Sequence, residues 1–353
     1  MPANQIPVRL SASTLRPPPE PRSPLTTSFV NEAGRGATSP VPRFSVSSLA
    51  TLPYLLPFLG GIVYVFAALF LKRTGESGGE TWHTIRICNW TAAVAFMPLL
   101  FLGGTFPGWD KLWQPALVGL LFVSGQVSTV LALKVGDVSL ATPVMGIKIV
   151  LVALLTAVVL EEWPSPTLWT AAILSSTAVA LLNFSPGGHR LRANLTIAIA
   201  GWAAFSYALF DVLVQKFSPA WGTGRFLPAM LAIVAIYSAF LRPWRTGAKP
   251  LASARPWLVG GALCLAAQAL LIVTPIALYG HATTANVLYS ARGMWSVVIV
   301  WLVGHWFGNR EQRLPRQVLV CRLLGAALMT AAVIVVLTNP VQPARARTAS
   351  AAK

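Results

Sequence analysis

Charged residues are scarce in this 353-residue chain: Asp, Glu, Lys and Arg together make up 10% of it, and ten of them are acidic. A soluble domain typically carries about 25% charged residues. The hydrophobic share is 55% and the mean hydropathy is +0.65. This composition excludes an ordinary soluble domain and predicts an all-α integral membrane protein that crosses the membrane several times.

The residue patterns of several kinds of chemistry are also missing. The three cysteines, Cys88, Cys264 and Cys321, are far apart and form no CxxC pair, so we expect inert buried thiols rather than disulfides. The four histidines show no HExxH or similar spacing, and no GxSxG, Walker or GxGxxG motif occurs. The sequence therefore argues against an enzyme, against a metal or other cofactor, and against ATP-driven transport within this chain.

The formal net charge is +17, but much of the basic charge falls in loops and tails. Because it is not gathered in a patch interleaved with aromatic residues, we expect no nucleic-acid partner. Residues 1–50 hold nine Pro, five Arg and two acids, which predicts a disordered N-terminal tail. A transit peptide and a misassigned start codon are both left open for this segment. Residues 339–353 are expected to be a C-terminal tail.

Apolar segments of membrane-spanning length alternate with short polar breaks along the rest of the chain. The loops between them are too short to hold a soluble domain. The pattern predicts ten transmembrane helices, near residues 52–71, 85–104, 113–133, 138–160, 166–184, 194–216, 225–241, 256–279, 283–307 and 316–338.

Two stretches of the chain repeat each other. Residues 136–148, GDVSLATPVMGIK, align without a gap to residues 280–292, GHATTANVLYSAR, and this alignment places Lys148 on Arg292. A charge at the centre of a spanning helix costs roughly 2.5–3.5 kcal/mol on insertion scales. A membrane protein that carries such a charge twice, at matched positions, is predicted to use it.

Further matches extend the repeat to both halves of the chain. Gln126 corresponds to Gln268, and Tyr64 near the end of the first predicted helix corresponds to Tyr207 in the sixth. An odd number of helices in each repeat inverts the second copy relative to the first, which is typical of secondary transporters. We therefore expect two inverted five-helix repeats, over residues 51–184 and 194–338.

The sequence resembles the EamA-type members of the drug/metabolite transporter superfamily over roughly residues 52–338. The resemblance rests most on GDVSLATPVMGIK, on Glu161 and Glu162 at the acidic end of the fourth predicted helix, and on the small-residue final helix of each half. Pro143 and the acidic end fit the family pattern. In the second half, Val287 stands at the Pro position and His305 at the position of Glu161, so this half departs from the pattern.

The resemblance implies a transporter in the plasma (inner) membrane with cytoplasmic termini. Lys and Arg counts in the short loops instead place both termini outside, so the orientation stays open. GxxxG-like spacings such as Gly304 with Gly308 are too common in membrane helices to decide for or against a homodimer. The expected partners are a small-molecule substrate and membrane lipid.

Lys148 and Arg292 are the first candidates for substrate binding. An ammonium and a guanidinium near mid-membrane are expected to clamp a carboxylate or phosphate group, since guanidinium offers a fork for such groups. The alternative is a structural cation paired with an acid. On a continuous helix, Tyr289 and Trp295 would flank Arg292 and could stack on an organic moiety, although aromatics at helical spacing more often pack. Lys148 would have apolar neighbours: Val144, Met145, Leu151 and Val152.

Asp211 is the acid that lies well inside a predicted helix. It is interpreted either as the counter-charge of Lys148 or Arg292, as a proton-coupling carboxylate, or as an interfacial acid beside Lys216. Gln126 and Gln268 are candidate substrate ligands, with helix-to-helix hydrogen bonding as the alternative. Glu161 or Glu162 could form a gate with a loop Arg, with a structural helix-end role as the default.

These patterns predict a secondary transporter that moves a small organic, anionic or zwitterionic metabolite by alternating access, with proton coupling through Asp211 as an option. One rival is a lipid-linked flippase that uses the same cations for a headgroup phosphate. Another is a membrane scaffold or sensor without transport, which would have no need of matched central charges.

Overall fold

The computed structural model describes residues 46–135, 138–183, 193–241, 252–303 and 316–339. The described residues all belong to one compact unit. Most of the predicted N-terminal tail and nearly all of the C-terminal tail lie outside the described residues. The first helix begins at Val46, four residues before the predicted end of the tail.

The described residues form helices and no strand, as expected for a chain whose backbone polar groups must be satisfied within the segment that crosses the lipid. Short 3₁₀ segments occupy Met97–Leu102, Trp109–Lys111 and Ala252–Ala254. The α-helices are α1 (Val46–Glu76), α2 (Thr81–Phe96), α3 (Trp113–Val135), α4 (Val138–Met145), α5 (Lys148–Val159), α6 (Pro166–Leu182), α7 (Ala193–Trp221), α8 (Thr223–Ala239), α9 (Arg255–Tyr279), α10 (Ala282–Ser290), α11 (Arg292–Val303) and α12 (Arg316–Thr338).

Within the described ranges, seven helical segments are long and apolar enough to cross a membrane. They include α1, α3, α7, α9 and α12, together with α2 extended by its 3₁₀ turn and the joined α4 and α5. Helices α6 and α8 are also apolar, with 17 residues each. The chain is therefore an integral membrane protein that crosses the bilayer several times.

Two of the predicted helices are broken near their centres. The expected single helix 138–160 ends as α4 at Met145 and resumes as α5 at Lys148. The expected helix 283–307 ends as α10 at Ser290 and resumes as α11 at Arg292, and residues 304–307 lie outside the described ranges. Both predictions of continuous helices are wrong, and each of the two matched cations is instead the first residue of a half-helix.

The first break has a local cause. Pro143 has no amide hydrogen to donate, and the chain then tightens, with the amide of Gly146 3.0 Å from the Pro143 carbonyl and that of Ile147 3.1 Å from the Val144 carbonyl. The hydroxyl of Ser176 on α6 donates to the Gly146 carbonyl at 3.1 Å, which satisfies an acceptor inside the apolar region. Val144 therefore does not lie one turn before Lys148 on a continuous helix, as the sequence suggested.

The second break is held by close packing of α1. At Gly61, a Cβ atom would lie 3.1 Å from the Tyr289 carbonyl oxygen and 3.3 Å from the Arg292 amide nitrogen. Only a residue without a side chain lets α1 approach the break this closely. The amide of Ala291 donates to the Leu288 carbonyl at 3.2 Å, which is the tight 3₁₀ pattern seen at the first break.

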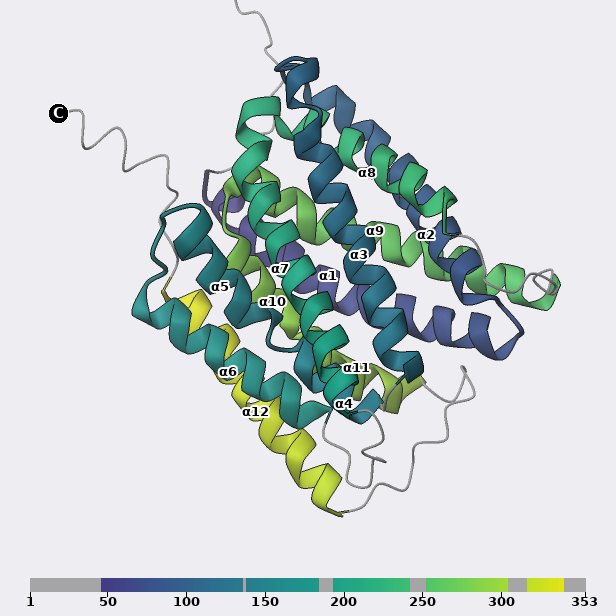
Figure 1. Cartoon of the computed structure of the whole chain (residues 1–353). Coiled ribbons are helices and arrows are strands. Elements are labelled where there is room, and N and C mark those ends of the chain that lie inside the picture. The colour runs from purple at the N-terminus through teal and green to yellow at the C-terminus, as the bar shows by residue number, and fades with distance from the viewer. Residues whose placement is uncertain (1–45, 136–137, 184–192, 242–251, 304–315, 340–353) are drawn as a thin grey trace, which may run out of the picture. The chain divides into compact units, whose positions relative to one another are not determined.

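Helices from the two halves of the chain pack against each other (Figure 1). Helix α1 lies along α9, α3 lies along α7, and α6 lies along α12. The largest buried apolar cluster joins residues of α2, α3, α5, α7, α8, α9 and α10. Its core therefore surrounds the region where α5 and α10 meet α7.

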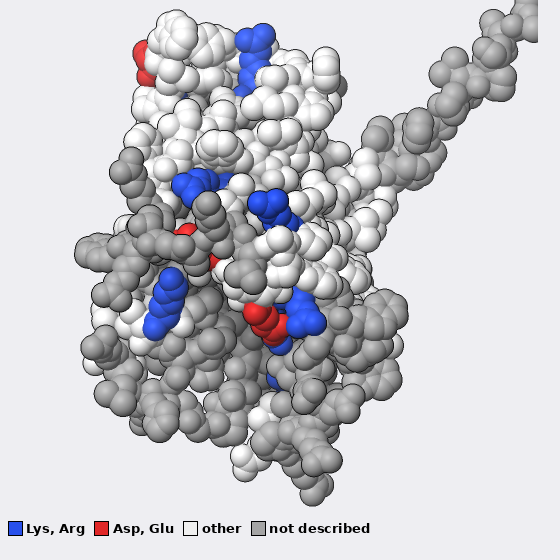
Figure 2. Space-filling view, turned by 90° about the vertical axis from the view of Figure 1, so that its right-hand side faces the viewer, with Lys and Arg blue, Asp and Glu red and all other residues white. Residues whose placement is uncertain are grey.

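Basic side chains lie at helix ends. Figure 2 shows several Lys and Arg side chains, and fewer Asp and Glu, on the side that faces right in Figure 1. Two cations contact tryptophan rings: Lys134 Nζ lies 5.3 Å from the Trp82 ring centre, and Arg73 Cζ lies 5.8 Å from that of Trp257. Tryptophan and basic residues near helix ends are typical of the membrane–water interface.

Candidate functional site

The two helix breaks bring the matched cations to one group of tyrosines. Lys148 Nζ, at the start of α5, lies 5.8 Å from the ring centre of Tyr207 on α7. Arg292 Cζ, at the start of α11, lies 4.5 Å from the ring centre of Tyr64 on α1. Each cation therefore faces the repeat-matched tyrosine of the other half of the chain.

Lys148 forms an ion pair with Asp211. Its Nζ lies 2.7 Å from Asp211 Oδ2, and Asn286 Nδ2 donates to the same oxygen at 2.8 Å. The Asp211 side chain is 3% exposed and that of Lys148 is 20% exposed. The carboxylate is thus buried and neutralised, while the ammonium remains partly accessible. Asp211 is therefore the counter-charge of Lys148, and its role in proton coupling stays a prediction.

Arg292 has aromatic partners instead of an acid. Its Cζ lies 4.5 Å from the ring centre of Tyr289 as well as from that of Tyr64. The Tyr289 hydroxyl donates to Gln268 Oε1 at 2.6 Å. Among the described residues, no carboxylate lies within 4 Å of this guanidinium. Its charge is therefore balanced only by π faces and neutral dipoles.

Helix α10 links the surroundings of the two cations. Its Asn286 donates to Asp211, the partner of Lys148, and its Tyr289, three residues later, contacts Arg292. The Tyr207 ring packs on Gly125, where a Cβ atom would approach to 3.0 Å. One central cluster therefore contains both cations, and we define it by its members: Tyr64, Lys148, Tyr207, Asp211, Asn286, Tyr289 and Arg292.

A second set of contacts ties α5, α7 and α10 together beyond the cluster. Gln215 Oε1 accepts the Ala282 amide at 3.0 Å, and Gln215 Nε2 lies 3.4 Å from Glu162 Oε2. Lys216 Nζ donates to the Val159 carbonyl at 3.0 Å. Among the described residues, the partner of Glu162 is Gln215, and a gate with a loop Arg stays a prediction. We call these contacts, with the 3.4 Å approach of the Thr156 and Thr283 hydroxyl oxygens, the α5–α7–α10 closure.

The remaining predicted residues lie at different distances from the cluster. Gln268 orients Tyr289 through the hydrogen bond above. Gln126 exchanges two hydrogen bonds of 2.9 Å with Asn89, so it joins α3 to α2. Trp295 packs edge-on against Phe58, with ring centres 5.9 Å apart. The buried Nε1 of Trp295 has no hydrogen-bond partner among the described residues.

Sequence reasoning gave no site role to Tyr64 or Tyr207, and little weight to Asn286. The first two were recognised as repeat-matched residues, and that match was the available signal. The alignment does not show that each tyrosine contacts the cation of the opposite half. Asn286 lies in the repeated stretch, but its partner Asp211 is on another helix.

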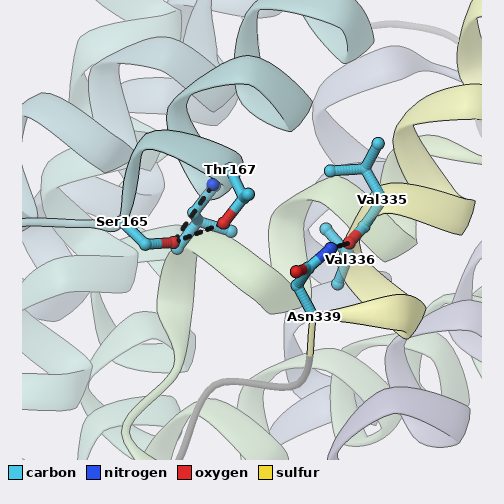
Figure 3. A pocket seen from close by; sticks show the side chains of 6 residues that line it. Ser165, Thr167, Val335, Val336 and Asn339 are labelled. Atoms are coloured by element: carbon cyan, nitrogen blue, oxygen red, sulfur yellow. Dashed lines mark hydrogen bonds between the residues drawn. The ribbon is translucent and has the colours of Figure 1, made fainter.

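A small pocket elsewhere has no comparable chemistry. It lies between the start of α6 and the end of α12 (Figure 3). Ser165 Oγ lies 2.8 Å from the Thr167 hydroxyl oxygen and accepts the Leu168 amide at 3.3 Å, and Asn339 Nδ2 donates to the Val335 carbonyl at 3.0 Å. These polar groups complete helix ends and carry no charge. Within the described ranges, no three His, Cys, Asp or Glu side chains gather closely enough to hold a metal ion.

Residues 51–184 match the EamA-like transporter family. The matched range coincides with the first predicted repeat, and the expected resemblance to EamA-type drug/metabolite transporters is confirmed. The match covers less than half of the chain. Together with the long apolar helices, it supports a multi-pass membrane protein.

No curated protein matches the EamA-like chain. Among solved structures, one described only as "Crystal structure of protein" is similar, with a TM-score of 0.59 and 16% sequence identity. The similarity covers 82% of this chain and 96% of that one. At this identity, it shows a shared fold.

Proposed function

We propose that the EamA-like protein is a secondary transporter of the plasma (inner) membrane that moves a small organic, anionic or zwitterionic metabolite by alternating access. One observation carries the proposal: two broken helices begin their second halves with Lys148 and Arg292, and both cations belong to one cluster. Discontinuous helices whose ends meet inside the membrane form the substrate sites of many secondary transporters.

Ten crossings in two inverted repeats are part of this proposal. The repeats would comprise α1–α6 and α7–α12, with each broken helix counted as one crossing. In this arrangement α1, α2, α3 and α4 correspond to α7, α8, α9 and α10. Each contact between the halves should then have a counterpart with the roles swapped. The α1–α9, α2–α9 and α1–α10 contacts have their counterparts in the α7–α3, α8–α3 and α7–α4 contacts. The α6–α12 and α2–α8 contacts map onto themselves. Helix packing therefore supports a pseudo-twofold relation between the halves.

The position of the α5–α7–α10 closure supports alternating access. This closure holds the end of α5 and the start of α10 against α7, so it would block one route to the central cluster. The opposite state would break the contacts of Gln215 and Lys216 and open that route. A substrate shifts the balance between the two states only through its different affinity for each.

Proton coupling would use the ion pair. A substrate with two anionic groups, one of which draws Lys148 away, would leave the Asp211 carboxylate with the Asn286 amide as its partner. An unpaired buried carboxylate is costly and is relieved by taking up a proton. Proton uptake at Asp211 would then accompany the movement of Lys148, which is how the charge pair could link substrate and proton.

Counterflow measurements in proteoliposomes test the proposal. Vesicles with purified protein would be preloaded with single metabolites from anionic, zwitterionic, cationic and neutral classes, and uptake of the labelled metabolite would be followed. We expect counterflow for members of the first two classes, and its loss in Lys148→Gln and Arg292→Gln. Lys111→Gln, which removes an exposed cation at a helix start, is the matched control and should retain counterflow. Unaltered counterflow in both cluster variants would contradict a substrate role for these cations.

A lipid-linked substrate would give a different result in the same vesicles. A flippase would move a fluorescent phospholipid or polyprenyl phosphate between leaflets and would show no counterflow of water-soluble metabolites. Such a result, dependent on Arg292, would replace the soluble metabolite with an amphiphilic one.

A further inference from the structure

We propose that the transported solute carries one net negative charge, and that its carboxylate or other monoanionic group binds Arg292 while Asp211 stays paired with Lys148. This inference rests on the proposed transport function and specifies the substrate class of the same site. It replaces the expected two-cation clamp by a division of roles, in which Lys148 is neutralised by the protein and Arg292 by the solute.

The charge balance of the central cluster is the first step. Lys148 and Arg292 contribute two positive charges and Asp211 one negative charge, so the cluster carries a net charge of +1. Glu162, the acidic residue of the α5–α7–α10 closure, accepts a hydrogen bond from Gln215 and forms no ion pair with Lys148 or Arg292. Among the described residues, the cluster therefore lacks one negative charge.

Arg292, rather than Lys148, is the cation that lacks a counter-charge among the described residues. Asp211 Oδ2 already receives Lys148 and Asn286 at 2.7 and 2.8 Å, so Lys148 is electrostatically satisfied. Arg292 contacts two tyrosine faces, whose quadrupoles compensate a full charge only in part. An uncompensated cation deep in a membrane protein is unfavourable, which gives an entering anion a strong reason to bind there.

The donors around Arg292 suit a compact anionic group. A guanidinium has five N–H groups in a planar fork, and in the structure Arg292 contacts the faces of Tyr64 and Tyr289. Trp295, three residues after Arg292 and so on the same side of α11, has a buried Nε1 donor that is unpaired among the described residues. A carboxylate could accept from several of these donors together.

Other charge classes fit less well. A zwitterion would leave the net charge of the cluster at +1, and its ammonium group would compete with Lys148 for Asp211. A dianion would overcompensate the cluster unless Asp211 took up a proton. Monoanion binding is therefore expected to proceed without proton uptake, whereas dianion binding should require one proton.

A charge-graded ligand series on a common scaffold tests this inference. The probes are 3-phenylpropanoate (−1), 3-phenylpropanamide (neutral), phenylalanine (zwitterion) and phenylsuccinate (−2), with the corresponding C3 and C6 aliphatic acids and amides as scaffolds of other sizes. Binding would be measured by thermal shift and calorimetry on the full chain. On at least one scaffold, we expect the monoanion to bind about tenfold or more tightly than its amide. Arg292→Gln should abolish that preference, and Lys111→Gln should retain it.

Two variants of the ion pair make the inference sharper. Asp211→Asn raises the cluster charge to +2, so the dianion should become the preferred ligand. If that variant does not fold, the double variant Lys148→Met/Asp211→Asn keeps the net charge at +1 and should keep the monoanion preference of wild type. Calorimetry in buffers of different ionisation enthalpy should show no proton uptake with the monoanion.

Three results would overturn the inference. An Arg292-dependent preference of wild type for the zwitterion or the dianion would show that the charge balance is wrong, while transport as proposed would stand. Monoanion binding that is equal in wild type and Arg292→Gln would place the anion elsewhere. A wild type that prefers no monoanion over its amide on any scaffold would reject the monoanion class; if counterflow were also absent for every metabolite class, the proposed function would fall with it.

Discussion

The Lys148–Asp211 ion pair gives the sharpest stability prediction. Removing one partner of a buried ion pair typically costs about 3–5 kcal/mol, because the other charge is left buried and unpaired. Lys148→Met strands a carboxylate that is 3% exposed, with the Asn286 amide as its remaining partner. Asp211→Asn strands an ammonium that is 20% exposed and therefore partly hydrated. We expect the Lys148→Met cost near the upper end of this range and the Asp211→Asn cost near the lower end.

The double variant decides whether the cost comes from the pair itself. Lys148→Met/Asp211→Asn leaves no stranded charge at this position, and replacement of both partners of a buried pair is often close to neutral. The double variant should therefore be more stable than either single variant. We expect a coupling free energy of roughly 3 kcal/mol or more, well beyond the roughly 0.5 kcal/mol within which independent sites add.

Reversible unfolding in mixed detergent micelles would measure these free energies. Lys134→Met is the matched control, since it removes an exposed Lys whose observed contact is the Trp82 ring. A cation–π contact at an exposed site is worth about 0.5–1 kcal/mol, so this variant should lose little stability. Single-variant costs that add within roughly 0.5 kcal/mol in the double variant would refute the coupled pair.

Three further predictions concern the second helix break, the α9–α10 loop and the α5–α7–α10 closure. Gly61→Ala would force a Cβ atom to 3.1 Å from the Tyr289 carbonyl, so it should destabilise the protein by about 1–3 kcal/mol and weaken anion binding. The control Gly201→Ala, whose Cβ would have no atom within 4 Å, should change neither stability nor binding. Equal losses in the two variants would contradict the steric reason. Burial lowers the pKa of His281 from its ordinary value of 6.5, so its contribution to stability is complete above pH 6.5 and is lost as pH falls through the depressed value. His281→Gln should therefore make the melting temperature depend less on pH between pH 7 and pH 5. An unchanged pH dependence would assign the effect to other groups. The hydroxyl oxygens of Thr156 and Thr283 lie 3.4 Å apart in the closure, so cysteines at these two positions should form a disulfide in a chain whose native cysteines are replaced. Counterflow should stop when this pair is oxidised and return when it is reduced. Transport by the oxidised protein would show that the closure does not open.

The sequence alone determined that this protein lies in a membrane and where its helices fall along the chain. Lipid imposes long apolar segments on every crossing, and hydropathy is a local property of the chain, so the predicted segments coincide with the helical regions of the structure. The gapless match of Lys148 to Arg292 also predicted their equivalence, which recurs as the first residues of two half-helices. Pro143 and Gly146 are a local signal for the first break. No proline marks the second, where close packing of Gly61 against the break takes its place.

Only the tertiary structure decided which charges and rings meet. Asp211 lies 63 positions from Lys148, and nothing local could show that it neutralises this cation rather than Arg292. The same holds for Gln126, whose amide is used by Asn89, and for Tyr64 and Tyr207, which face the cations of the opposite repeat. Such pairings depend on how helices from the two halves pack, and the net charge that remains at Arg292 follows from that packing.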